Sequence, residues 1–124
     1  MAGTIVCNTL NTDTGVFSTN NAYGAIPKAW VVFNGTAATI TAAFNVSSIS
    51  RTGTGLYTVN FATAFADTNY NIVGCFFDAS HQGNISTYTV SSPINTGSFS
   101  FGCRAMPADA YVDSTGVYLS FYHL

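Results

Sequence analysis

The acidic side chains of this chain are five aspartates, and there is no glutamate. Two carboxylates standing roughly 5 to 9.5 Å apart perform acid and base catalysis in glycoside hydrolases. Every aspartate here lies in a turn-like segment, where this residue commonly accepts hydrogen bonds from nearby backbone. Asp109 and Asp113 share one segment and could bind Ca²⁺ or act as a pair, although turn formation is the interpretation that we favour. We therefore predict no catalytic carboxylates.

The histidines and cysteines also lack a recognisable reactive motif. His81 follows Asp78 in a polar stretch, but no serine lies in the G-x-S-x-G motif of a nucleophile. Cys7, Cys75 and Cys103 include no C-x-x-C pair of the kind that holds structural zinc. Each lies in a strand-like run, so we expect small buried thiols. The sequence predicts no enzyme, no metal site and no cofactor.

Binding remains plausible because a tyrosine offers a flat apolar face and a hydroxyl group. Such rings suit both saccharide stacking and protein interfaces. Core packing is the expected role of most tyrosines, while Tyr23 and Tyr111 lie in predicted loops and are the better surface candidates. The candidate residues of exposed binding loops are Asp78, His81, Gln82, Asn84, Asp109, Tyr111 and Asp113.

The composition favours β-structure as the framework for these residues. The 124 residues suit one domain with a real core, and they are 48% hydrophobic, 15% aromatic and only 6% charged. β-Branched and aromatic residues fit a pleated sheet, whereas the strong surface helix formers Glu, Lys, Gln and Arg are nearly absent. We therefore expect strands and no significant helix.

A hairpin is the clearest predicted element. Strands over Val46 to Arg51 and Leu56 to Phe61 flank Thr52-Gly53-Thr54-Gly55, whose glycines allow the positive φ of tight turns. The apolar parity flips between Val46 and Ile49, which a β-bulge explains.

Other apolar runs predict the rest of the sheet structure. Ala29 to Phe33 and Tyr70 to Phe77 are apolar on both faces, which is typical of strands covered on both sides. The final strand, Val117 to Leu124, alternates instead. About eight or nine strands at roughly ten-residue spacing predict an antiparallel β-sandwich, jelly-roll-like in form.

The N-terminal part differs from the rest of the chain. We expect a strand over Thr4 to Leu10, then an irregular tract rich in Asn, Gly and Pro that either reaches a neighbouring subunit or crosses the sandwich edge. We favour the first alternative and divide the chain into an arm, residues 1–27, and a sandwich domain, residues 28–124. The candidate residues of the docking arm are Ile5, Val6, Leu10, Val16, Phe17 and Tyr23.

The low charge favours obligate assembly over a monomer whose surface is solvated by Thr, Ser and Asn side chains. Isolated soluble domains usually carry about a quarter charged residues, which keep neighbouring molecules apart. Lys28, Arg51 and Arg104 are scattered and form no basic stripe, so we expect no nucleic-acid partner. No apolar run approaches the roughly 20 residues that span a bilayer, and the first residues lack the pattern of a signal peptide. We therefore expect no membrane partner.

Five segments in order carry a resemblance. They are Thr4–Gly15, Lys28–Thr36 (KAWVVFNGT), Phe44–Ile49 (FNVSSI), Gly53–Phe61 (GTGLYTVNF) and Ala66–Tyr70 (ADTNY). Together they resemble a family of small virion proteins of tailed bacteriophages, common in marine and freshwater phages including cyanophages. Members are usually described as tail-fibre or fibre-tip-like proteins.

The resemblance implies a homotrimeric, non-enzymatic β-protein on the virion surface, assembled in the bacterial host cytoplasm. Because no coiled coil or fibre shaft precedes Lys28, we expect the chain to sit directly on the particle. The function that we favour is a decoration or cement protein bound to the phage major capsid protein or another virion protein. The alternative is the receptor-binding tip of a tail or head fibre, which recognises a host-surface glycan.

Overall fold

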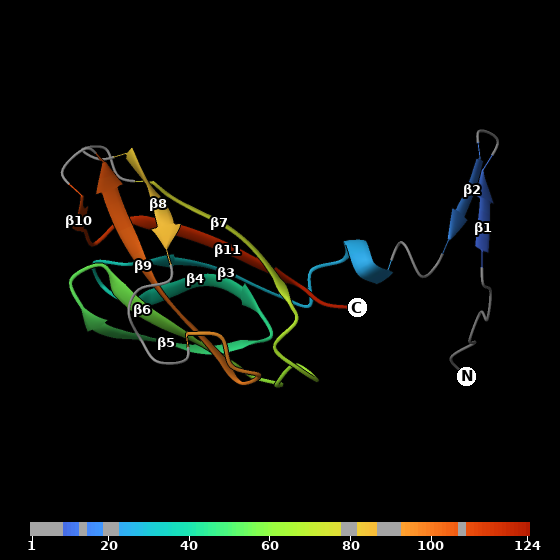
Figure 1. Cartoon of the computed structure of the whole chain (residues 1–124), viewed down its shortest axis with the longest axis horizontal. Coiled ribbons are helices and arrows are strands. Elements are labelled where there is room, and N and C mark those ends of the chain that lie inside the picture. Colours follow the sequence, from blue (N-terminus) through green and yellow to red (C-terminus); the bar gives the residue numbers. More distant parts are fainter. Residues whose placement is uncertain (1–8, 13–14, 19–22, 78–81, 87–92, 107–108) are drawn as a thin grey trace.

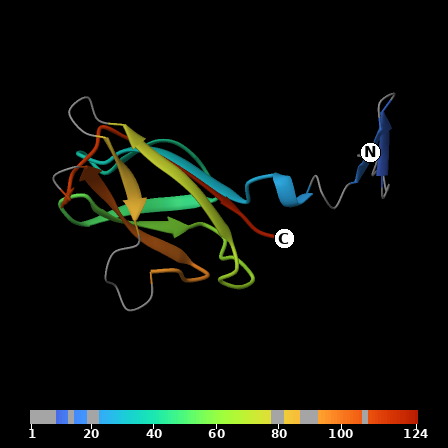
Figure 2. The same cartoon turned by 45° about the horizontal axis from the view of Figure 1, so that its top comes forward.

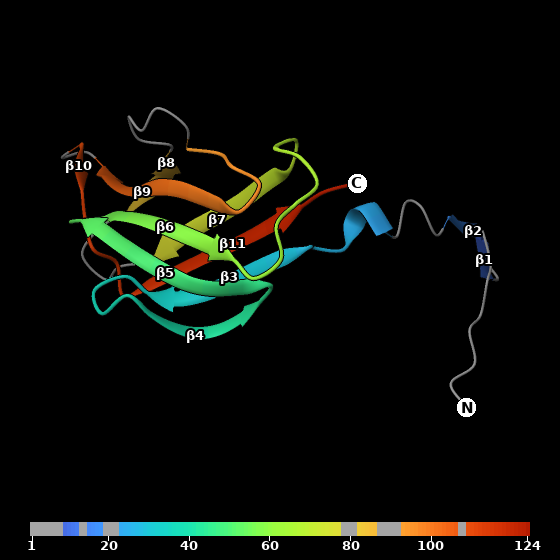
Figure 3. The ribbon, with the colours of Figure 1, turned by 90° about the horizontal axis from the view of Figure 1, so that it is seen from below.

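Two antiparallel sheets pack face to face in the computed structural model (Figure 1). The structure describes residues 9–12, 15–18, 23–77, 82–86, 93–106 and 109–124. Figure 3 shows the two layers from below, with β5 and β6 in front of β3 and β11. The predicted antiparallel β-sandwich with nine strands and essentially no helix is confirmed; one helical turn, residues 23–25, precedes it.

Each sheet combines a hairpin of consecutive strands, β3–β4 or β5–β6, with strands from distant parts of the chain. The four-stranded sheet has the order β4 (Thr39–Phe44), β3 (Ala29–Asn34), β11 (Gly116–Tyr122) and β7 (Asn71–Phe77). The five-stranded sheet has the order β10 (Ala110–Tyr111), β9 (Ser98–Met106), β6 (Leu56–Phe61) and β5 (Val46–Gly53), and β8 (Gln82–Ser86) pairs with β9.

The core lies between the sheets and is rich in aromatic side chains. Alternate residues of β3, β6, β9 and β11 point inward, as the two-residue period of a strand requires. The Phe33 and Tyr57 rings meet edge to face at 5.3 Å across the two sheets, and Phe99 stacks on Phe101 at 5.6 Å. Burial of these rings is the main source of stability for the sandwich.

The predicted hairpin and its bulge are both confirmed. Strands β5 and β6 pair from Val46 with Phe61 to Gly53 with Leu56, and the register shifts between Val46 and Ser48. Gly55, in the turn, has a φ of 66°. The parity flip in the sequence therefore reports a real irregularity of the ladder.

The chain passes from the first sheet to the second at Asn45. This residue has a φ of 55°, and its side-chain amide donates to the backbone oxygens of Lys28 and Thr63, each at 3.1 Å. Its Oδ1 accepts from the backbone N–H of Thr63 at 2.7 Å. Asparagine tolerates this left-handed conformation better than most residues, so Asn45 is suited to the corner.

The sequence predicts exposed loops over Asp78 to Asn84 and Met106 to Thr115, and parts of both are strands in the structure. Gln82 to Asn84 belong to β8, where they pair with Met106 to Arg104, and Ala110 and Tyr111 form β10. Both are edge segments, whose backbone pairing with β9 does not need apolar side chains. Alternation therefore gave no sign of them.

The N-terminal region forms a third, two-stranded sheet. β1 (Thr9–Thr12) pairs with β2 (Gly15–Ser18), so part of the tract expected to be irregular is a hairpin. Figures 1 and 2 show this hairpin beyond the helical turn, away from the sandwich. Most of the predicted first strand lies outside the described residues.

Candidate functional site

The face of the four-stranded sheet that points away from the core is apolar, and no other described segment of the chain covers it. Register places Phe44 beside Trp30 and Val73 beside Ser120, all pointing outward. Val73 is 57% exposed and Phe77 is 64% exposed. The expectation that β3 and β7 are covered on both sides is therefore wrong for the single chain, because the second sheet covers only one face. The outer face comprises Trp30, Val32, Ala42, Phe44, Asn71, Val73, Cys75, Phe77, Tyr118, Ser120 and Tyr122.

None of these outer-face residues carries a charge at neutral pH. A groove of about 320 Å³ runs along the face between the Trp30 and Tyr118 side and the Val73 and Cys75 side. The described ion pairs, such as Arg51 with Asp113, lie elsewhere. Exposed, contiguous apolar surface of this kind marks interaction sites in soluble proteins.

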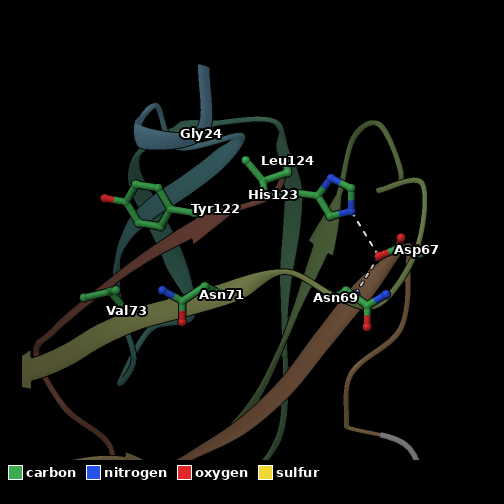
Figure 4. Close-up of a pocket in the computed structure, with 8 residues that line it drawn as sticks. All are labelled: Gly24, Asp67, Asn69, Asn71, Val73, Tyr122, His123 and Leu124. Carbon is green, nitrogen blue, oxygen red and sulfur yellow. Dashed lines mark hydrogen bonds and ion pairs between the residues drawn. The ribbon is translucent and has the colours of Figure 1, made fainter. Parts of the chain in front are cut away.

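A larger pocket of about 870 Å³ lies at the end of the outer face, where β11 leaves the sheet. We call it the end pocket, and Figure 4 shows its lining. Tyr122, Asn71 and Val73 form one side, and His123, Asp67 and Asn69 form the other. Gly24 and Leu124 complete the lining. Val73 lines both the groove and the end pocket, so the two are adjacent.

Two interactions hold the Asp67 carboxylate in place in the end pocket. Its Oδ1 accepts the backbone N–H of Asn69 at 2.7 Å and lies 3.0 Å from His123 Nε2. The hydrogen bond from Asn69 and the His123 ring hold the pKa of the Asp67 carboxyl below its usual value. The carboxylate is therefore ionised and oriented, and its side chain is 52% exposed.

The predicted loop residue Asp113 has a structural role, because its carboxylate is held by several hydrogen bonds. Its carboxylate binds Arg51 through Nε at 3.1 Å and Nη2 at 2.5 Å, and accepts from the Gly55 N–H and the Tyr57 hydroxyl, each at 2.7 Å. Arg51 and these hydrogen bonds lower the pKa of Asp113 to about 2. Burial and the Asp113 carboxylate raise the pKa of Tyr57. Asp113 therefore joins β5, β6 and the segment after β10.

The other half of the predicted pair is also engaged. Asp109 has a φ of 53° and accepts from Arg104 Nη2 at 2.8 Å. The Arg104 guanidinium lies 5.9 Å from the centre of the half-buried Tyr111 ring. Asp109 and Asp113 thus have different partners, and the favoured structural role for both is consistent with this geometry.

The remaining predicted site residues are spread over the chain. Asn84 is exposed on β8, whereas Tyr23 is 59% exposed in the helical turn, with Lys28 Nζ 3.2 Å from its ring centre. These predictions stay open. Leu10, Val16 and Phe17 belong to the β1–β2 hairpin, and Gln82 belongs to β8. Asp78, His81, Ile5 and Val6 lie outside the described residues.

The cysteines have different environments. Cys103 is buried, and burial raises the pKa of its thiol to about 12, whereas Cys75 is exposed on the outer face, contrary to expectation. Within the described part of the chain, no group of three or more His, Cys, Asp or Glu side chains could hold a metal ion. The same residues include no helix long and apolar enough to cross a membrane.

Sequence reasoning missed the end pocket because its parts are far apart in the chain. Asp67 and Asn69 precede β7, whereas Tyr122 and His123 end β11, and only the β7–β11 register brings them together. The outer face did leave a signal, since the two-sided apolar runs in β3 and β7 indicate that something covers the second side.

No protein-family model, curated protein or solved structure matches this chain. The strand pairing alone therefore defines the fold. The resemblance to phage virion proteins stays a prediction.

Proposed function

We propose that this chain is a non-enzymatic structural protein that assembles as a homotrimer through its outer face and decorates the exterior of a tailed-phage head. The observation that carries the assembly part is the uncharged apolar outer face of the four-stranded sheet. The resemblance of Lys28–Thr36 and the later segments supports the virion part.

A second copy is the occupant that best fits the outer face. The face offers no charge to attract an acidic or basic partner, and the net charge of −2 gives little repulsion between copies. The unpaired side of β4, all six residues of which are exposed, offers a further edge to a neighbour. If a second copy covered the face and the edge, the apolar residues on both faces of β3 and β7 would be buried.

Repetition on a particle would make weak docking contacts effective. A trimer that binds only assembled shell subunits stabilises the shell by mass action. Because its three copies are joined, their weak contacts with the shell add together. No chemistry by the decoration protein is required.

The copy number per particle tests the virion part. We expect quantitative mass spectrometry of purified virions to give copies comparable in number with the shell protein. Copies comparable with a tail component would contradict decoration and favour the second candidate.

The second candidate is a tail-fibre or head-fibre tip that recognises a host-surface glycan. The observation that favours it is the end pocket, which combines an aromatic ring with amide and carboxylate groups.

A further inference from the structure

We propose that the end pocket is a binding site for a neutral saccharide. Its volume of about 870 Å³ lies in the range of small-molecule sites. Asp67, Asn69, Asn71 and Val73 are exposed, so the pocket is open along one side and admits a residue of a longer chain. This inference needs no place in a virion. Because Asn71, Val73 and Tyr122 belong to both the outer face and the end pocket, it requires that assembly through the outer face leave the pocket open.

The two sides of the end pocket supply complementary polar groups. The Asp67 carboxylate accepts hydrogen bonds, and the Asn71 amide both donates and accepts them. Among the described residues, the structure gives the Asn71 side chain and the Tyr122 hydroxyl no hydrogen-bond partner. A hydroxyl-rich ligand can use all three groups, since each sugar hydroxyl donates one hydrogen bond and accepts others.

The apolar part of the lining suits the C–H faces of a sugar ring. Tyr122 presents an aromatic ring, and Val73 and Leu124 lie on the same lining (Figure 4). An aromatic face beside a few placed polar groups fixes both the position and the orientation of a ligand.

The charge of the lining excludes other ligand classes. No lysine or arginine is among the described lining residues, and the His123 ring is already paired with Asp67, so an anion would meet the Asp67 carboxylate without a lysine or arginine to offset it. One carboxylate and one imidazole are too few to hold a metal ion. A purely apolar ligand would leave Asp67 desolvated and without hydrogen bonds from the ligand.

The site can be tested on the ¹⁵N-labelled full-length protein by NMR. The probes are the methyl glycosides of glucose, galactose, mannose and N-acetylglucosamine. We expect at least one of them to shift the side-chain amide signals of Asn69 and Asn71 with a dissociation constant of about 1–10 mM. Absence of any shift at about 100 mM of every probe would overturn the proposal.

Two variants locate the binding. Asn71→Ala should weaken the active glycoside at least tenfold, and Tyr122→Leu, which keeps the apolar bulk, should do the same. The control Asn84→Ala removes an exposed asparagine from β8 in the other sheet and should leave affinity within twofold. Equal affinity in Asn71→Ala and Asn84→Ala would contradict binding in the end pocket.

An anionic sugar tests the charge argument. Glucose 6-phosphate should bind more weakly than the active methyl glycoside, and tighter binding would contradict a neutral ligand. Sedimentation of the same samples separates this inference from the proposed function. A protein that forms a trimer but shows no chemical shift changes with any sugar contradicts the saccharide site alone. A protein that remains a monomer but responds to a sugar contradicts assembly alone.

Discussion

At the scale of single residues, Asp113 is one of the few charged residues of the chain, and it connects separate strands. Four hydrogen bonds converge on its carboxylate, from Arg51, Gly55 and Tyr57. Hydrogen bonds to a charged group contribute more to stability than neutral ones. The aspartate that looked like a loop ligand in the sequence therefore acts as a tie between strands.

Replacing this carboxylate should destabilise the fold. Asp113→Asn loses the Arg51 ion pair, and we expect the free energy of unfolding to fall by about 2 kcal/mol. The matched control is Asp109→Asn, because Asp109 is an exposed partner of Arg104 and asparagine also tolerates its φ of 53°. Urea unfolding should show a change under about 0.5 kcal/mol for this control. Equal losses in the two variants would contradict the tie.

The same carboxylate predicts an acid dependence. The folded-state pKa of Asp113, about 2, lies below the ordinary value of 3.8, so its stabilisation is present above about pH 4 and is lost as the pH falls through 2. The difference in unfolding free energy between wild type and Asp113→Asn should therefore shrink between pH 4 and pH 2. A difference that stays constant over this range would argue against the ionised tie.

Asn45 combines a left-handed backbone with a hydrogen-bonded side chain. Asn45→Ala loses three side-chain hydrogen bonds and places an alanine at a φ of 55°, and we expect a loss of about 2–4 kcal/mol in unfolding free energy. Asn45→Gly loses the same bonds but accepts the backbone, so it should recover about 1 kcal/mol. Thermal or urea unfolding measures both, and a glycine variant no more stable than the alanine variant would contradict the backbone part.

At the scale of elements, the hairpin β5–β6 tests the prediction that its tight turn needs glycine for a positive φ. Gly55 has a positive φ, and a β-carbon there would lie 2.5 Å from the backbone N of Val112. Gly55→Ala should therefore cost more than about 2 kcal/mol in unfolding free energy. At Gly53 the nearest group is a flexible leucine end at 3.3 Å, so Gly53→Ala should cost under about 1 kcal/mol. The reverse order would refute this description of the turn.

Alternation predicted the strands that bury one face against the core. In β6, β9 and β11 the inward residues Tyr57, Phe101 and Leu119 were recognisable from the two-residue period. Gln82 and Asn84 of β8 were predicted to lie in a loop, because they carry no apolar pattern and only pairing with β9 makes them a strand. The end pocket was missed for a related reason: strand register is not visible in the order of residues.

At the scale of the whole molecule, the outer face is the feature that a single sandwich leaves unexplained. Apolar residues on β4, β3, β11 and β7 face solvent together, and the groove on this face adjoins the end pocket at Val73. The proposal that copies of the chain cover this face accounts for both the two-sided strands and the low charge. It also predicts which substitutions separate folding from assembly.

A charge on the outer face should break assembly without unfolding the sandwich. Val73→Lys changes an exposed side chain in the lining of the groove, so the isolated chain can solvate the ammonium group while an interface cannot. The matched control is Ser50→Lys, an exposed strand position of the other sheet. Circular dichroism should show the same β-structure in both variants.

Sedimentation velocity of the full-length protein at micromolar concentration tests the assembly claim most directly. We predict a trimer for the wild type and for Ser50→Lys, and a monomer for Val73→Lys. A wild-type protein that sediments as a monomer, or a Val73→Lys variant that remains a trimer, would contradict assembly through the outer face.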